Sequence, residues 1–91
     1  MKFDTILQHG GYKPEEHGGH LTEPIYQDAA AKMPNCEEAA RRFSGESDGL
    51  TYARAGNETA LIFERRVAEL EGGEAALSFA SGMAAIQSLV L

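Results

Sequence analysis

Apolar and polar positions divide the chain into an aperiodic first third and a helical remainder. Between residues 8 and 24, six glycines and prolines prevent any sustained period of 2 or 3.6, which predicts an extended arm. Because such an arm has little apolar surface of its own, we expect it to lie on another body, either the rest of its chain or a second subunit. We therefore divide the chain into an extended N-terminal arm, residues 1–34, and the start of a larger domain, residues 35–91.

Two amphipathic helices are predicted between residues 35 and 72. Asn35 and Glu38 have the spacing of a capping box, in which each side chain accepts a backbone N–H of the first turn, and Gly45 can stop this helix. Asn57 is the expected N-cap of the second helix, and Gly72 ends it. The core-facing stripe of the second helix is expected to comprise Ala60, Phe63, Val67 and Leu70.

Residues 75–80 form a short, mostly apolar run between two glycines, which predicts a buried strand. A further helix is expected after it, with Met83, Ile86, Leu89 and Val90 turned toward a core. A lone strand cannot pair its own backbone N–H and C=O groups, and no stop signal follows the last helix. We therefore expect either further chain after Leu91, which we favour, or association of identical chains through exposed apolar faces.

Charge and composition argue against several classes of function. Acidic residues outnumber basic ones 14 to 8, whereas nucleic-acid binding requires clustered Lys and Arg. No apolar run approaches the ~20 residues of a membrane-spanning helix, and the first residues lack the apolar core of a signal peptide. The single cysteine, Cys36, cannot form an internal disulfide. These features predict a cytoplasmic protein with no nucleic-acid or membrane partner.

The histidines raise the hypothesis of a zinc site, because imidazole and thiolate are both zinc ligands. His17 and His20 lie in a glycine-rich segment, while His9 and Cys36 lie elsewhere in the sequence. Without paired cysteines or a supporting carboxylate, this spacing favours surface histidines over metal ligands. We expect no metal site.

The Ser81-Gly82-Met83 turn is a candidate anion site at the start of the last predicted helix. A strand that turns through glycine into a helix points several free N–H groups at one position, and the helix dipole adds partial positive charge there. Phosphate suits such a site. Taken alone, a serine cap and a tight glycine turn are the favoured explanation of these residues.

Tyr52 and Arg54 form a second candidate site in a loop with glycine on both sides. An arginine fork can bind two phosphate oxygens at once, and a phenol hydroxyl adds one further directed donor. Taken alone, an exposed loop arginine beside a partly packed tyrosine is the simpler interpretation. The pair and the Ser81-Gly82-Met83 turn together favour phosphate binding.

Six short motifs, in this order, extend over nearly the whole chain. They are His9-Gly10-Gly11-Tyr12, Pro24-Ile25-Tyr26-Gln27, Phe43-Ser44-Gly45-Glu46, Tyr52-Ala53-Arg54 with Asn57, Leu70-Glu71-Gly72-Gly73-Glu74-Ala75-Ala76-Leu77 and Ala80-Ser81-Gly82-Met83-Ala84-Ala85-Ile86. On these motifs the sequence resembles the N-terminal region of the Cys/Met-metabolism family of pyridoxal-phosphate (PLP) enzymes, the trans-sulfuration enzymes. Within the family it is most similar to the methionine gamma-lyase branch and next to the O-acetylhomoserine sulfhydrylases.

The resemblance implies an α/β fold of the type I, aminotransferase-like class, with residues 35–91 at the start of the PLP-binding large domain. It also implies a homodimer or homotetramer whose active sites are shared between subunits. In the family, the Tyr-x-Arg pair reaches the cofactor phosphate held by a neighbouring subunit, which assigns that role to Tyr52 and Arg54. The Ser-Gly-Met turn holds the same phosphate, which assigns Ser81, Gly82 and Met83 to the cofactor site.

The implied reaction is gamma-elimination or gamma-replacement on a small sulfur amino acid: methionine, cystathionine or an O-acylhomoserine. PLP chemistry needs a lysine that bonds to the cofactor, and none of Lys2, Lys13 and Lys32 matches the family's lysine. We therefore assign no catalytic residue and expect no turnover by these 91 residues alone.

Three departures from the family pattern accompany the resemblance. Glu58 replaces the proline of the Asn-Pro-Thr motif, and Ala53 stands where Ser or Thr is usual. Asp28-Ala29-Ala30-Ala31 replaces a hydroxyl-rich stretch. The alternative hypothesis is a catalytically inactive truncated fragment, or an oligomerisation or interaction module.

Overall fold

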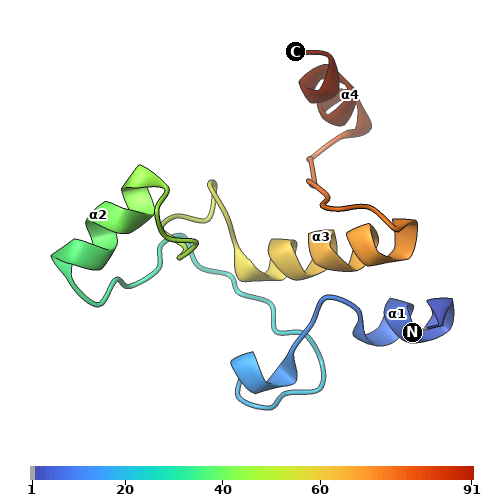
Figure 1. Cartoon of the computed structure of the whole chain (residues 1–91), viewed down its shortest axis with the longest axis horizontal. Helices are drawn as coiled ribbons and strands as arrows, with labels where there is room; N and C mark the ends of the chain where they lie inside the picture. Colours follow the sequence, from blue (N-terminus) through green and yellow to red (C-terminus); the bar gives the residue numbers. More distant parts are fainter. Residues whose placement is uncertain (1) are drawn as a thin grey trace.

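A computed structural model describes residues 2–91, and its regular elements are all helical (Figure 1). The elements are α1 (Phe3–His9), a short 3-10 helix (Pro14–Glu16), α2 (Cys36–Ser44), α3 (Glu58–Glu71) and α4 (Gly82–Val90). One isolated antiparallel β-bridge joins Ala30 and Tyr52. None of the helices in residues 2–91 has the length and apolar character needed to cross a bilayer.

The predicted ends of α2 and α3 are confirmed. The Asn35 side chain accepts the Glu38 N–H at 2.7 Å, and Gly45 ends α2 in the left-handed region with φ 84°. Asn57 caps α3, and Gly72 ends it with φ 67°. The reciprocal half of the capping box is wrong, because the Glu38 carboxylate pairs with arginines of its own helix instead.

The sequence predicted an extended arm, but residues 3–9 of that arm form the helix α1. A helix of seven residues is marginal in water, so packing must stabilise it. Within residues 2–91, α1 and α3 are the only helices in contact, and they lie side by side in Figure 1. The expectation that the arm lies on another body is confirmed, and that body is α3 of the same chain.

The core lies between the arm and α3, on a different face of α3 from the predicted one. Ile62 is only 3% exposed and Ala68 is also buried, whereas Phe63, which belongs to the predicted stripe, is 60% exposed. The arm is hydrogen-bonded to Thr59 and Arg66 on the side of α3 that contains Ile62, so contact with the arm, and not the strongest apolar stripe, decides the burial of Ile62. The predicted stripe is wrong for Ala60 and Phe63, which are exposed, whereas Val67 and Leu70 are half-buried.

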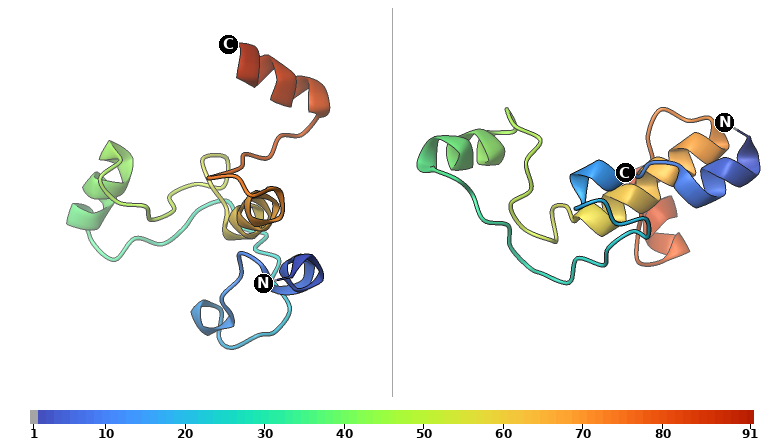
Figure 2. Two further views of the ribbon diagram at one scale, coloured as in Figure 1. Left: turned by 45° about the vertical axis from the view of Figure 1, so that its right-hand side comes forward. Right: turned by 90° about the horizontal axis from the view of Figure 1, so that it is seen from below.

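The predicted buried strand at residues 75–80 is not formed. The segment has no ladder partner among the described residues, and Leu77 and Phe79 are exposed. Hydrogen bonding to a neighbouring strand defines a strand, and no such neighbour exists in residues 2–91. The helix predicted after it is confirmed as α4, but its apolar side chains are exposed and not in a core. Figure 1 and the left view of Figure 2 show α4 away from the pair α1 and α3.

Candidate phosphate site

The loop that carries Tyr52 and Arg54 leads into α3, and its backbone is fixed by pairing with the end of the arm. The Ala31 N–H donates to the Thr51 C=O at 3.1 Å, and the Ala53 N–H donates to the Ala29 C=O at 2.7 Å. These bonds flank Tyr52 on both sides and form the isolated bridge. Because only backbone groups are used, the alanines that replace the usual hydroxyl residues leave this pairing intact.

The side chains of Tyr52 and Arg54 are exposed and lie next to each other. The Arg54 guanidinium carbon is 5.5 Å from the centre of the Tyr52 ring, within the range of a cation–π contact. Neither the guanidinium nor the phenol hydroxyl has a hydrogen bond or an ion pair within residues 2–91. Their donors are therefore available to an anion, and a phosphate dianion fits this donor set.

The second predicted half of the site begins α4. The Ser81 hydroxyl accepts the Ala84 N–H at 3.1 Å, so this side chain serves as the N-cap. The backbone N–H groups of Gly82 and Met83 have no acceptor in the part of the chain that the structure describes. Free N–H groups at the positive end of a helix dipole are suited to a phosphate oxygen.

The two predicted halves are not brought together within one chain. Tyr52 and Arg54 precede α3, whereas Ser81 to Met83 follow it (Figure 1). α3 has 14 residues, and at the rise of an α-helix its ends are roughly 20 Å apart. No hydrogen bond or ion pair joins the two halves among the described residues.

Asn57 and Thr59 have a second role that the sequence reasoning missed. The Asn57 amide caps α3 through Oδ1, while its Nδ2 donates to the Tyr26 C=O at 2.9 Å. The Thr59 hydroxyl accepts the Tyr26 N–H at 2.8 Å and donates to the Pro24 C=O at 3.0 Å. The arm is thereby bound to the start of α3, a few residues from Arg54. The sequence motif Asn57-x-Thr59 could have indicated this contact, but helix capping alone was sufficient to explain the asparagine.

His17 is buried and hydrogen-bonded, so its interpretation as a surface histidine is wrong. Its Nδ1 lies 2.6 Å from the Tyr26 hydroxyl, and its ring stacks on Tyr12 with centroids 5.2 Å apart. Burial, with a smaller contribution from the nearby Glu23, raises the pKa of the Tyr12 hydroxyl. His20 is exposed, and residues 2–91 contain no group of three or more His, Cys, Asp or Glu side chains placed to hold a metal.

Arg66 of α3 holds two further points of the arm, Gly10 and Glu23. Its Nε donates to the Gly10 C=O at 2.8 Å, and its Nη2 pairs with the Glu23 carboxylate. The hydrogen bond from Arg66 lowers the pKa of Glu23. Gly11 has φ 70°, and a Cβ there would lie 2.7 Å from the Arg65 Cβ, so only glycine lets the arm pass this close to α3.

Comparison with known proteins relates the chain to one enzyme family. The family model of the Cys/Met metabolism PLP-dependent enzymes matches residues 4–91. L-methionine gamma-lyase of Pseudomonas putida is 49% identical over 86 residues, which cover 94% of this chain and 22% of that protein. O-acetyl-L-homoserine sulfhydrylase 1 of Thermus thermophilus is 41% identical over 93% of this chain and 20% of its own length.

A solved structure extends the likeness to the fold. A Campylobacter jejuni protein assigned as O-acetylhomoserine (thiol)-lyase is 34% identical, superposes with a TM-score of 0.90, and is matched over 99% of this chain and 22% of its own. That structure carries a pyridoxyl-lysine phosphate. The chain thus spans about a fifth of the length of these relatives and forms a part of their fold. The resemblance seen in the six motifs is confirmed: the chain belongs to the Cys/Met metabolism PLP-dependent enzyme family.

Proposed function

We propose that this segment supplies cofactor-phosphate contacts to a PLP-dependent enzyme that performs gamma-elimination or gamma-replacement on methionine, cystathionine or an O-acylhomoserine. The observation that carries the proposal is the exposed Tyr52 and Arg54 pair, whose donors have no partner within residues 2–91. An unpaired arginine fork beside a phenol is the donor set that a phosphate dianion requires. PLP, when bound, supplies an electron sink for cleavage at the substrate's γ-carbon.

Each proposed contact has a defined task. The Arg54 guanidinium binds two phosphate oxygens, and the Tyr52 hydroxyl donates to one of them. The N–H groups of Gly82 and Met83 bind the same phosphate, and the Ser81 cap keeps them pointing out of the helix. Because no hydrogen bond or ion pair joins the two halves among the described residues, we infer that one chain contributes the Tyr52 and Arg54 half to the cofactor held by a second copy. The proposed assembly is therefore a homodimer or homotetramer of the type I, aminotransferase-like fold.

The covalent chemistry is proposed to reside outside these 91 residues. Lys2, Lys13 and Lys32 all belong to the arm, and none matches the family's cofactor-bonding lysine. Residues 1–34 then serve as the arm and residues 35–91 as the start of the cofactor-binding domain of a cytoplasmic enzyme. We propose no catalytic role for any residue of this segment.

The test replaces the arginine of the proposed clamp in a chain of full family length. Arg54→Ala should weaken PLP affinity on the order of 10- to 100-fold, since it removes hydrogen bonds to a charged group. Arg41→Ala is the matched control, because Arg41 is also an exposed arginine near the loop. PLP absorbance retained after dialysis measures the difference. Equal loss from the two variants would contradict the clamp.

The alternative function is an interaction module without catalysis, and the exposed apolar face of α4 favours it. Met83, Ile86, Leu89 and Val90 are all exposed. A module of this kind predicts that the full-length chain binds no PLP, while residues 1–91 associate with one another. Cofactor titration and sedimentation of both chains distinguish the two functions, because only the enzyme proposal requires PLP absorbance.

A further inference from the structure

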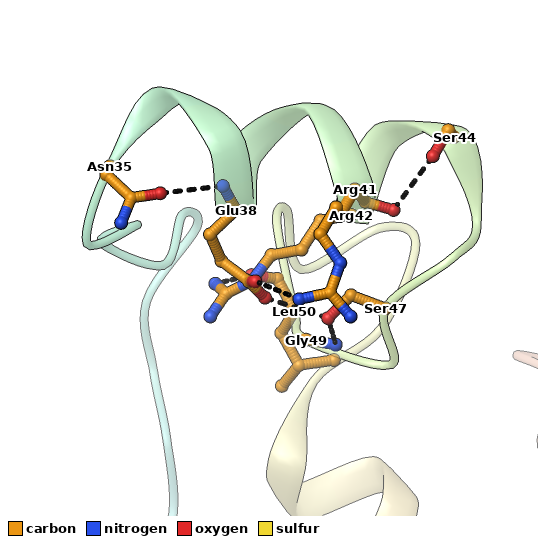
Figure 3. A network of polar contacts seen from close by, with 8 residues as sticks. All are labelled: Asn35, Glu38, Arg41, Arg42, Ser44, Ser47, Gly49 and Leu50. Carbon is orange, nitrogen blue, oxygen red and sulfur yellow. Dashed lines mark hydrogen bonds and ion pairs between the residues drawn. The ribbon is translucent and has the colours of Figure 1, made fainter.

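Three side chains bind the loop before Tyr52 to helix α2, and we call Glu38, Arg42 and Ser47 the loop brace (Figure 3). Arg42 Nε donates to the Glu38 carboxylate at 3.0 Å, and Arg42 Nη1 donates to the Leu50 C=O at 2.9 Å. The Ser47 hydroxyl donates to the same Glu38 oxygen at 2.8 Å. A single arginine therefore connects the helix to the backbone two residues before Tyr52.

The loop passes directly over the Arg42 side chain. The Gly49 N–H donates to the Ser47 hydroxyl at 3.3 Å, and a Cβ at position 49 would overlap the Arg42 guanidinium. From Leu50 onward the chain enters the backbone pairing around Tyr52. The brace and this pairing thus fix the two successive parts of the loop before Arg54.

Arg42 and its neighbour Arg41 differ in how far their side chains are buried in the loop brace. Both pair with Glu38, but the Arg42 side chain is 16% exposed and the Arg41 side chain 57% exposed. The Ser47 hydrogen bond, followed by that of Arg42, lowers the pKa of Glu38, so its carboxylate stays ionised beside Arg42 at neutral pH. The Arg42 guanidinium is paired and largely covered, so it is poorly available to an external anion. Arg54, by contrast, is exposed and has no ion pair within residues 2–91.

We propose that the loop brace is a positioning device for the phosphate clamp: Arg42 fixes the Leu50 carbonyl and thereby holds the Tyr52 and Arg54 loop in its binding conformation. The inference rests on the proposed function, because it assumes that Tyr52 and Arg54 bind phosphate. Ordering a loop on binding costs free energy, so a loop that is already ordered binds more tightly. Arg42 itself touches no cofactor in this arrangement and acts through Arg54.

The experiment compares PLP with pyridoxal, which lacks the phosphate, in the full-length holoenzyme and its variants. Arg42→Ala should weaken PLP affinity about fivefold, as expected for the loss of one or two hydrogen bonds, and leave pyridoxal affinity unchanged. Arg42→Lys keeps the charge and one hydrogen bond and should recover part of the loss. Arg41→Ala, the matched control, should leave both affinities unchanged.

A double variant separates positioning from simple damage to the fold. If Arg42 acts through Arg54, then Arg42→Ala combined with Arg54→Ala should bind PLP no more weakly than Arg54→Ala alone. Additive losses, or an equal loss of pyridoxal affinity, would overturn the positioning role. If Arg54→Ala alone has no effect, the clamp itself fails. A loss from Arg54→Ala with none from Arg42→Ala leaves the clamp standing and rejects the brace.

Discussion

The arm and the last seventeen residues differ in a way that their compositions do not suggest. Residues 8 to 24 are polar and rich in glycine, yet they are held against α3 by hydrogen bonds to their backbone. Residues 75–91 are mostly apolar, yet their large side chains are exposed. Apolar content therefore does not decide which segment is fixed. A segment is fixed when a second surface offers partners for its backbone or covers its side chains.

The arm finds such partners because α3 and its N-cap present polar side chains along the face that the arm covers. Arg66 binds the Gly10 carbonyl, and Asn57 and Thr59 bind the carbonyls of Tyr26 and Pro24. Each of these bonds joins residues more than thirty positions apart in the sequence. For α4 no second surface exists among the described residues, so its apolar face is exposed.

The largest difference in stability is expected between truncation of an apolar side chain under the arm and truncation of one on α4. Ile62→Ala should lower the free energy of unfolding by about 3 kcal/mol, because Ile62 is 3% exposed and its removal leaves a cavity. Leu89→Ala should change it by less than about 0.5 kcal/mol, since Leu89 is 86% exposed. Urea denaturation of the 91-residue chain measures both. Similar losses from the two variants would show that α4 is also packed in solution.

A smaller effect is expected from detaching the arm. Arg66→Ala removes the bond to the Gly10 C=O and leaves Glu23 without its partner, which should lower stability by about 2 kcal/mol. Amide hydrogen exchange should quicken across residues 10–24, while α4 should be unaffected. Arg65→Ala is the matched control, because Arg65 is exposed and forms no ion pair within residues 2–91. Unchanged exchange in Arg66→Ala would mean that Thr59 and Asn57 suffice to hold the arm.

The smallest effect is a dependence of arm docking on pH. Arg66 lowers the folded pKa of Glu23 below its ordinary value of 4.5, so the carboxylate stabilises the docked arm above that pH. The stabilisation should be lost as the pH falls through the lowered folded pKa, and it should amount to less than about 1 kcal/mol. His9 also lies near Glu23 and makes a smaller contribution to lowering the pKa of Glu23.

The comparison protein for this titration is Glu23→Gln, which keeps the side-chain shape but cannot ionise. The difference in unfolding free energy between the two proteins should be constant well above the ordinary pKa of 4.5 and shrink as the pH falls below it. Glu38, whose pKa is also lowered, is present in both proteins and cancels. A difference that does not change with pH would mean that Glu23 contributes no ionised contact.

Local signals in the sequence predicted the helix ends well and the buried faces poorly. Asn35, Asn57 and Ser81 each cap the helix that they were expected to cap. The stripe around Phe63, by contrast, is exposed, and His17 is buried although it was interpreted as a surface residue. A cap bonds within three residues of its own position, whereas burial depends on which distant segment covers a face.

The sequence by itself determined the helix boundaries, the family and the candidate phosphate residues, because these depend on residue identity at short spacing. The tertiary structure alone decided that the arm covers Ile62, that Asn57 and Thr59 hold Tyr26, and that Arg42 reaches the loop before Tyr52. It also left the two candidate halves of the phosphate site without a hydrogen bond or ion pair between them among the described residues. Such contacts join positions far apart along the chain, and their free energy comes from surfaces that meet only after folding.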